Sequence, residues 1–291
     1  MAIDFVNLVN VIISGVLTGL VYGLMALGLS VIFGVARVVN FAHGEMMTLA
    51  MYASVILFGA FELNPFIAVL PVAVIFFVLG YCLQRWIVNP FVTRPEHAQF
   101  MLLLAIAIIL TNGQLMVFGP DARSVRLDSL LESIELGALL IDRGKLYAAL
   151  VALSTAAALF SFFRFTRSGT AIRACADNWI GAKVVGLNVK QLYALAFGLG
   201  SVCVAVAGCM MLLLVDLTPS IGPGYTLLAF VIVIVGGLGS MNGALVGGVL
   251  IGLSEALAGL FIVPSAKSMF SFALLIVVLL LRPRGLLGGR R

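Results

Sequence analysis

Two acidic side chains stand in stretches of the sequence that are otherwise apolar. They are Glu45, at the start of one apolar run, and Glu255, inside a later one. A charge at membrane depth is costly, so each residue is a candidate for lining or gating a pathway through a membrane. Structural roles are the alternative. Glu45 would lie in the first turn of a helix, where its charge is favoured by about 0.3–1 kcal/mol. Glu255 would pair with a facing helix or with Lys267.

Two interruptions rich in glycine and asparagine divide the apolar runs. The first interruption reads RVVNFAHGE at residues 37–45, and the second reads GGLGSMNG at residues 236–243. Such breaks at corresponding positions of two halves indicate an internal repeat with a site near the membrane midplane. His43 is interpreted either as a hydrogen-bonded residue at the end of a span or as a proton relay. The candidate residues for the translocation path and its gating are Asn40, His43, Gly44, Glu45, Gly237, Ser240, Asn242 and Glu255.

The sequence patterns of common catalytic sites are missing. The chain has no G-x-x-x-x-G-K-[ST] nucleotide loop, no H-E-x-x-H zinc motif and no G-x-S-x-G nucleophile elbow. Its two histidines are too few for a His-rich metal site. We therefore expect a protein that is not an enzyme and that binds no metal and no cofactor itself. The cysteines are interpreted as small apolar fillers, and they are Cys82, Cys175, Cys203 and Cys209.

The composition places the elements that carry these residues in lipid. Hydrophobic residues make up 63% of the 291 and charged residues 10%, whereas soluble domains carry about 25% charged residues. Apolar runs of about 20 residues become helices in lipid, because each backbone group must be paired within its segment. We predict an all-α polytopic membrane protein of eight to ten helices, with two pseudo-symmetric halves as an option. The expected spans lie near residues 10–33, 44–61, 65–86, 98–118, 146–164, 190–214, 225–238, 243–262 and 268–281.

The positions of the charges predict how the chain is oriented. Lys and Arg concentrate in cytoplasmic connections, which would place the N-terminus outside and the C-terminus in the cytoplasm, with the chain in the cell inner membrane. The net charge of +5 then reflects topology, and no nucleic-acid partner is expected. Twelve of the 17 basic residues fall on the cytoplasmic side, namely Arg37, Arg85, Arg94, Arg164, Arg167, Arg173, Lys183, Lys190, Arg282, Arg284, Arg290 and Arg291.

Residues 1–291 are expected to form a single transmembrane domain with one large outer loop at about 119–145. That loop is interpreted as a solvated loop, with a small hairpin or a surface helix as options, or as a docking surface for a soluble partner. Small residues also recur at four-residue spacing, which lets helix backbones approach closely in lipid. These repeats indicate packing within the bundle or a seam between two copies, and their members are Gly15, Gly19, Gly23, Ala244, Gly248 and Gly252.

A long polar connection separates two later spans. It is the segment Arg167–Gly186, which reads RSGTAIRACADNWIGAKVVG. A turn of a few residues would suffice to join the spans, so we expect a helix over about 168–187 that a cytoplasmic partner grips. The pattern predicts one amphipathic helix whose apolar side carries Ile172, Ala176, Trp179 and Ile180.

Blocks of residues along nearly the whole chain resemble one known family. They are Gly28–Gly34, Val39–Glu45, Arg173-Ala174 with Asn178 and Ala182, Gly186–Asn188, Ala205–Gly208, Gly222, Gly236–Ser240 with Gly243, and Arg282–Gly288. In order and spacing they are similar to the LivH-type permeases, the membrane subunits of branched-chain amino-acid ABC importers. The resemblance implies a permease that forms a translocation path for leucine, isoleucine or valine, while ATP and magnesium bind to partner ATPases.

The resemblance also implies a coupling helix and a set of partners. In ABC importers, a cytoplasmic helix of the permease docks into a groove on the ATPase. The implied partners are a LivM-like second permease, two ABC ATPase subunits, a soluble substrate-binding protein and the lipid bilayer. A urea or short-chain amide importer and an ATP-independent secondary transporter are the alternatives. The residues of this chain expected to contact the ATPase are Arg173, Ala174, Asp177, Asn178, Ala182 and Gly186.

Overall fold

The computed structural model describes residues 5–92, 94–125, 127, 132–137, 139–261 and 267–288. Within these residues, eight helices are long and apolar enough to cross a membrane, which confirms the prediction of an all-α polytopic membrane protein. Each expected span overlaps one long helix or the apolar helix α12 (Lys267–Leu281), which has 15 residues. The long helices are α1 (Phe5–Ala36), α2 (His43–Phe61), α3 (Pro65–Cys82), α4 (Glu96–Phe118), α6 (Arg143–Phe165), α9 (Val189–Met211), α10 (Gly222–Gly236) and α11 (Met241–Phe261). Helix α10 reaches spanning length together with the 3-10 turn that precedes it, as the segment Pro219–Gly236.

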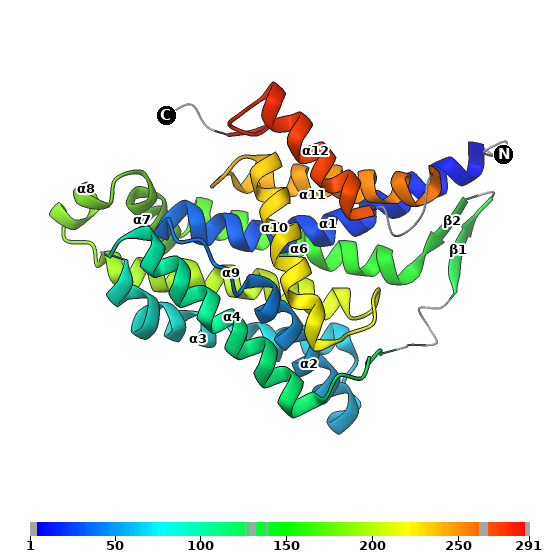
Figure 1. Cartoon of the computed structure of the whole chain (residues 1–291), viewed down its shortest axis with the longest axis horizontal. Coiled ribbons are helices and arrows are strands. Elements are labelled where there is room, and N and C mark those ends of the chain that lie inside the picture. The colour runs from blue at the N-terminus through cyan, green and yellow to red at the C-terminus, as the bar shows by residue number, and fades with distance from the viewer. Residues whose placement is uncertain are drawn as a thin grey trace.

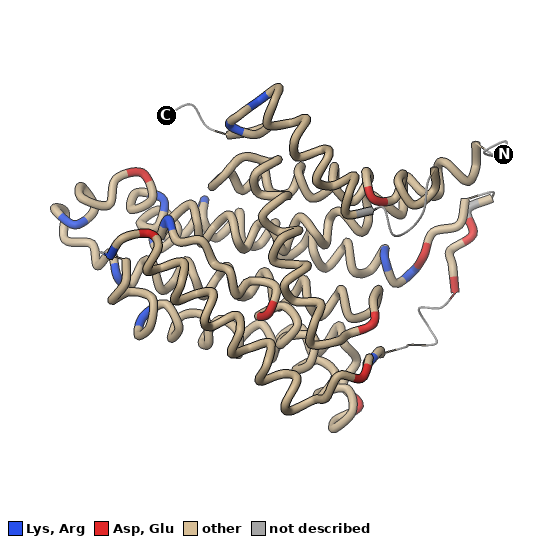
Figure 2. Tube along the Cα trace, in the orientation of Figure 1, with Lys and Arg blue, Asp and Glu red and all other residues tan. Residues whose placement is uncertain are grey.

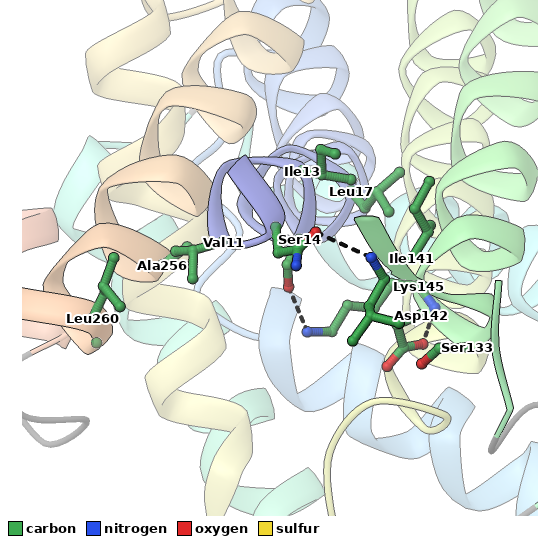
Figure 3. Close-up of a pocket in the computed structure, with 13 residues that line it drawn as sticks. Val11, Ile13, Ser14, Leu17, Ser133, Ile141, Asp142, Lys145, Ala256 and Leu260 are labelled. Carbon is green, nitrogen blue, oxygen red and sulfur yellow. Dashed lines mark hydrogen bonds between the residues drawn. The ribbon is translucent and has the colours of Figure 1, made fainter. Parts of the chain in front are cut away.

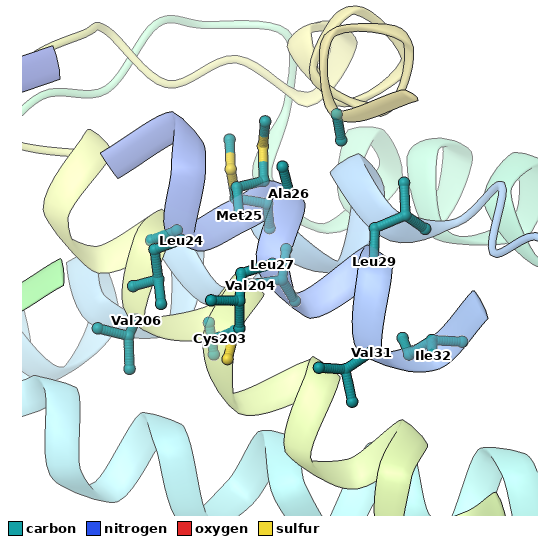
Figure 4. Packing of buried hydrophobic residues seen from close by; sticks show 14 of the residues in the cluster. Leu24, Met25, Ala26, Leu27, Leu29, Val31, Ile32, Cys203, Val204 and Val206 are labelled. Carbon is teal, nitrogen blue, oxygen red and sulfur yellow. The ribbon is translucent and has the colours of Figure 1, made fainter. Parts of the chain in front are cut away.

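Helix α1 is the centre of the bundle. It has 32 residues and so spans about 48 Å at 1.5 Å per residue, more than the roughly 30 Å of a bilayer's hydrocarbon core. Its side chains Leu24 and Leu27 have no accessible surface, and Figure 4 shows them beside Cys203 and Val204 of α9. Cys203 is a buried free thiol, which confirms its interpretation as an apolar filler.

Helices α1 and α11 lie antiparallel and side by side (Figure 1). Glycines remove the side chains that would separate the two backbones. A Cβ atom on Gly19 would lie 2.7 Å from the Cα atom of Val249. On α11, a Cβ atom on Gly248 would collide with Gly23, and one on Gly252 would collide with Gly19. The small-residue repeats therefore pack against each other within this chain, which is the first of their two interpretations.

The C-terminal end of α3 continues into irregular helical turns. These are the π-helical turn η1 (Leu83–Val88) and the 3-10 turn η2 (Asn89–Phe91). Gln84 Nε2 donates a hydrogen bond to Asn89 Oδ1 at 3.1 Å, and Asn89 Nδ2 donates to the carbonyl oxygen of Lys190 at 3.1 Å. Together these bonds fasten the end of α3 to the start of α9.

The connection between α4 and α6 contains a hairpin in its described part. Strands β1 (Ser133–Leu136) and β2 (Leu139–Asp142) pair antiparallel, with Ser133 opposite Asp142. Asp142 also caps α6, because its Oδ1 accepts a hydrogen bond from the backbone N–H of Lys145 at 2.9 Å. Part of the expected outer loop thus forms the small hairpin that the sequence left as an option, while residues 126, 128–131 and 138 lie outside the described residues.

The polar segment expected to form one helix over about 168–187 is instead two. Helix α7 (Arg167–Asp177) and helix α8 (Trp179–Val184) are separated by Asn178. Asn178 has φ −149°, and its Oδ1 accepts a hydrogen bond from the backbone N–H of Gly181 at 2.9 Å. An asparagine that caps a new helix in this way competes with continuation of the old one, so the prediction of one continuous helix is wrong.

The predicted apolar side of that helix is wrong for the same reason. Ile172 is fully buried against the bundle, whereas Trp179 and Ile180 lie beyond the break and are 51% and 58% exposed. Burial also raises the pKa of the Cys175 thiol on α7, so this cysteine stays protonated as an apolar filler. The two helices therefore have different surroundings, because α7 lies against α1, α6 and α9 while α8 projects from the bundle (Figure 1).

Charged residues separate toward the two ends of the molecule. We call the end that carries α7 and α8 the inner end, and the end that carries the hairpin the outer end. Figure 2 shows most Lys and Arg gathered at the inner end, and most Asp and Glu toward the outer end. This separation follows the charge pattern that predicted the orientation. The charges Asp4, Arg126, Asp128, Arg290 and Arg291 lie outside the described residues.

Candidate functional site

The first interruption turns inward after α1 and lets α2 begin inside the bundle. Asn40 is fully buried, and its Oδ1 accepts a hydrogen bond from the backbone N–H of Ala42 at 3.1 Å. This local bond satisfies a backbone donor in the turn that precedes α2. Asn40 therefore shapes the turn that places His43 and the residues after it in the core.

Glu45 is held by a threonine from a distant part of the chain. Its side chain is only 3% exposed, and Thr226 Oγ1 donates a hydrogen bond to Glu45 Oε2 at 2.9 Å. The same hydroxyl accepts a hydrogen bond from the backbone N–H of Gly44 at 2.8 Å. One threonine of α10 thus satisfies both a carboxylate and an otherwise unpaired donor in the first turn of α2.

Glycine and glutamine complete this cluster. A Cβ atom on Gly222 of α10 would lie 3.2 Å from the Cα atom of Glu45, so the lack of a side chain there allows the helices to meet. Gln114 of α4 donates from Nε2 to the backbone oxygen of Glu45 at 3.1 Å, while its buried Oε1 has no hydrogen-bond partner in the described structure. We call Gly44, Glu45, Gln114 and Thr226 the central polar cluster. It joins α2, α4 and α10.

His43 is fully buried beside this cluster. Its Nε2 lies 2.9 Å from the backbone oxygen of Met25, and because a carbonyl only accepts, the Nε2 atom carries the proton. The Nδ1 atom is buried with no hydrogen-bond partner among the described residues. The hydrogen-bonded interpretation of His43 thus matches its contacts, and the ring is fully buried in the core.

The second interruption lies at the inner end, apart from the central polar cluster. Gly237 has φ 110°, and the tail after α12 packs on it, with the backbone N–H of Leu287 donating to the oxygen of Gly236 at 2.9 Å. Ser240 caps α11, because its Oγ accepts from the backbone N–H of Gly243 at 3.1 Å. Asn242 is exposed. The two interruptions therefore do not form one polar site.

Glu255 of α11 lies apart from both the central polar cluster and the second interruption. Ser271 of α12 donates from Oγ to Glu255 Oε1 at 2.9 Å, and the Tyr22 hydroxyl of α1 also hydrogen-bonds the Glu255 carboxylate. The carboxylate thus joins α1, α11 and α12, which agrees with the interpretation that it pairs with facing helices. The side chain of Lys267, the other partner considered, lies outside the described residues.

The predicted ATPase contacts on α7 and α8 have unequal access to a partner. Arg173, Ala174, Asp177 and Asn178 are exposed, whereas Ala182 is only 5% exposed and packs into the chain's own fold. Gly186 has φ 87°, and a Cβ atom added to it would have no other atom within 4 Å, so glycine is needed there for its backbone conformation. The exposed apolar residues of this region are Trp179, Ile180, Val184 and Val185.

A pocket of about 480 Å³ opens at the outer end between α1, α11 and the hairpin. Figure 3 shows Lys145 reaching toward Ser14, to whose Oγ its Nζ donates at 2.6 Å. The backbone N–H of Leu140 donates to Oδ1 of Asn10 at 3.1 Å. The first bond joins α6 to α1, and the second docks the hairpin on the first turns of α1.

Sequence reasoning missed the partners of the candidate residues. Thr226, Gln114, Tyr22 and Ser271 are all uncharged polar residues inside apolar helices. Their positions inside apolar spans could have identified them as partners, because a hydroxyl or amide group in lipid needs a hydrogen-bond partner much as a charge does. Charge alone marks Glu45 and Glu255 but not the uncharged groups that hydrogen-bond them.

A bundle of apolar helices, broken inside by buried polar clusters, defines a polytopic membrane protein of the transport class. The family described as "Branched-chain amino acid transport system / permease component" matches residues 11–279. The chain belongs to that family and is a membrane permease component that acts with other chains of a transport system.

Named relatives align along nearly their whole length. The high-affinity branched-chain amino acid transport system permease protein LivH of Escherichia coli (strain K12) is 29% identical, over 99% of this chain and 98% of the relative. The corresponding protein BraD of Pseudomonas aeruginosa is 27% identical over 95% of this chain and 94% of its own. A probable LivH of Methanocaldococcus jannaschii is 26% identical over 91% and 88%. The suspected LivH-type family is therefore confirmed.

Proposed function

We propose that this chain is the membrane-spanning permease subunit of an ABC importer for branched-chain amino acids. The observation that carries the proposal is the family match over residues 11–279, together with relatives from three organisms named for the same transport. In this role the chain forms part of the translocation path and binds no cofactor itself. ATP and magnesium bind to partner ATPases, where the hydrolysis takes place.

The proposed assembly contains a LivM-like second permease, two ABC ATPases and a soluble substrate-binding protein. The inner end would face the cytoplasm, with the N-terminus outside, because positive charge gathers around α7 and α8 (Figure 2). The hairpin and the pocket beside Lys145 would then face the binding protein. This arrangement places the ATPases and the binding protein at opposite ends of the bundle.

Helix α8 is the part of the chain proposed to contact an ATPase. Its exposed Trp179 and Ile180 project from the inner end, and exposed apolar residues that gather outside the lipid-facing spans mark interaction surfaces. Helix α7 is anchored, because Ile172 is buried and α7 packs on α1, α6 and α9. A movement of α8 would therefore reach the bundle through α7, and ATP-driven closure of the ATPases would shift it between outward and inward states.

Uptake by reconstituted importer tests the substrate. Proteoliposomes with this chain, its permease partner, both ATPases and the binding protein should accumulate labelled leucine on addition of ATP. Labelled urea should not accumulate. Leucine uptake that persists without the ATPases would support an ATP-independent transporter, and uptake of urea in place of leucine would support the amide importer; either result would overturn the proposal.

Co-purification with the ATPase tests the role of α8. Ile180→Glu puts a charge on a half-exposed apolar side chain and should lower ATPase co-purification about tenfold or more, since a central interface residue whose change costs about 2 kcal/mol weakens binding by more than tenfold. Leu140→Glu is a matched control on the hairpin, where Leu140 is 54% exposed. It should leave co-purification unchanged. Equal losses in both variants, or none in Ile180→Glu, would remove α8 from the proposed contact.

A further inference from the structure

A second pocket lies at the inner end, where α1, α7, the second interruption and the tail meet. Its volume is about 680 Å³, within the range of roughly 300–1,000 Å³ usual for small-molecule sites. Apolar side chains from several elements line it, including Phe33, Phe163 and Leu287. We call it the inner pocket. The central polar cluster does not contribute to it.

The inner pocket carries charges of both signs. Arg37, just after α1, and Arg173 and Asp177 of α7 are among its lining residues. The ion pair found in the described part of the chain joins Arg143 to Glu132 at the outer end, so these three side chains have no ionic partner there. Two guanidinium groups and one carboxylate are thus available to a ligand at the same pocket.

Two residues that line the inner pocket, Ser30 and Arg37, have an unusual hydrogen-bonding state or backbone conformation. Ser30 is fully buried on α1, and its hydroxyl has no hydrogen-bond partner in the described structure. Buried polar atoms are nearly always paired, so this unpaired hydroxyl is unusual, although it has no accessible surface through which a ligand could reach it in this conformation. Arg37 has φ 54°, which is uncommon for a residue other than glycine. Such strained positions occur often at ligand-binding sites.

We propose that the inner pocket binds a zwitterionic amino acid with an apolar side chain, an inference that rests on the proposed function. A guanidinium group pairs with a carboxylate through two parallel hydrogen bonds, so Arg37 and Arg173 would hold the α-carboxylate. Asp177 would hold the α-ammonium group, and the apolar lining would receive the side chain. The two charges of the ligand match the signs of the pocket, and its apolar part matches the wall.

This assignment changes the role of two residues predicted to contact the ATPase. Arg173 and Asp177 are four residues apart and so lie on one face of α7, and both line the inner pocket. A ligand there touches α1 and α7 at once. The substrate would therefore leave the bundle beside α7, the helix that connects α8 to the spans. Its release would depend on the packing of α7 against α1.

Photo-crosslinking locates the ligand directly. The full chain in nanodiscs is irradiated with photo-leucine, a diazirine analogue that keeps both charges of leucine, and the labelled peptides are mapped by mass spectrometry. Labels are expected in residues 30–37, 173–177 and 238–241, and leucine in excess should prevent them. 4-Methylpentanoate lacks the ammonium group and isopentylamine lacks the carboxylate, so both should compete at least about tenfold more weakly. Inorganic phosphate should not compete. Labels only elsewhere, or equal competition by phosphate, would overturn the proposal.

A pair of arginine variants tests the carboxylate contact. Arg173→Gln removes a charged donor and should reduce labelling of the inner pocket at subsaturating photo-leucine about tenfold, the usual size for loss of a charge-assisted hydrogen bond. Arg167→Gln changes another exposed arginine of α7 that does not line the pocket and should label as the unchanged chain does. Equal labelling in both variants would contradict the inference.

Leucine uptake by the reconstituted importer separates the two proposals. Uptake without labelling of the inner pocket would leave the proposed function standing and would reject the inner pocket as a substrate site. No leucine uptake by the complete importer would reject the proposed function. If excess leucine still blocked photo-labelling of the inner pocket in that case, the pocket would be an amino-acid site with another purpose.

Discussion

The two interruptions of the apolar sequence contain similar residues but have different surroundings. In the first, His43 and Glu45 are buried, and their polar atoms reach Met25 and Thr226 on other helices. In the second, Ser240 bonds only the helix that it caps, and Leu238 to Ser240 line a pocket that opens at the inner end. One interruption holds helices together in the core, and the other lines a pocket at the inner end.

The neighbours of each interruption explain this difference. Gly222 allows α10 to approach Glu45, which buries the first interruption and supplies Thr226 as its partner. At the second, the chain after α12 lies on Gly237 and pairs with the last carbonyl groups of α10. Glycine and polar residues in an apolar sequence thus mark where a helix breaks, while the depth of the break depends on which helix packs against it. Four substitutions test this contrast.

Gly44→Ala should have the largest effect. A Cβ atom there would collide with the carbonyl oxygen of Gly222, and it would lie 2.5 Å from the backbone nitrogen of Thr226. Backbone atoms cannot move aside cheaply, so we expect a loss of roughly 3 kcal/mol or more of stability, at the upper end for overpacked cores, with loss of uptake. Thermal unfolding in detergent measures it. Gly59→Ala on the same helix has no atom within 4 Å, and a similar loss there would contradict the argument from contact.

Thr226→Val should destabilise the central polar cluster with little change in shape. The substitution leaves the backbone N–H of Gly44 and the Glu45 carboxylate without the hydroxyl that joins them. Each unsatisfied buried group costs about 1–3 kcal/mol, so the apparent melting temperature should fall clearly. Thr226→Ser keeps the hydroxyl and should retain most of the stability. If the serine variant melts as low as the valine variant, the hydrogen bonds are not what matters.

Gly237→Ala should have a smaller effect at the second interruption. The residue has φ 110°, and an added Cβ atom would lie 2.5 Å from the backbone nitrogen of Gly288. Strain of this kind costs about 1–3 kcal/mol, but the tail can shift away to relieve the contact. Gly224→Ala in α10, the helix that ends just before Gly237, has open space and serves as the control in a melting experiment. A loss as large as that of Gly44→Ala would mean that the second interruption is as tightly enclosed as the first.

Ser240→Ala should have the smallest effect of the four. It removes the Oγ that accepts from the backbone N–H of Gly243, and loss of such a cap costs about 0.5–2 kcal/mol. Ser240→Asp keeps an acceptor and should melt close to the unchanged chain. Should both variants lose uptake while melting normally, the side chain would be needed for transport and not for capping.

Sequence patterns predicted the elements better than the sites. Apolar runs located every long helix, and the repeated glycines correctly indicated close packing. The polar segment was also found, but its division at Asn178 was not, because an asparagine within a helical pattern looks the same whether it caps a new helix or faces solvent. Ala182, a contact that the family resemblance implies, is only 5% exposed in this chain. The neighbouring elements decide whether a small residue packs within the chain's own fold or is free to contact a partner chain.

The sequence by itself determined that this protein lies in a lipid bilayer, and it determined where the helices lie. The reason is that apolar content and the length of each apolar run decide whether a segment can leave water. It also located the two interruptions, because glycine and asparagine favour breaks wherever they occur. Only the tertiary structure decided which interruption became the buried one and which polar groups met. Gly44 and Thr226 are 182 residues apart in the chain, and local pattern contains no information on a partner at that distance. The central polar cluster and the inner pocket both exist because helix packing brings such distant residues together.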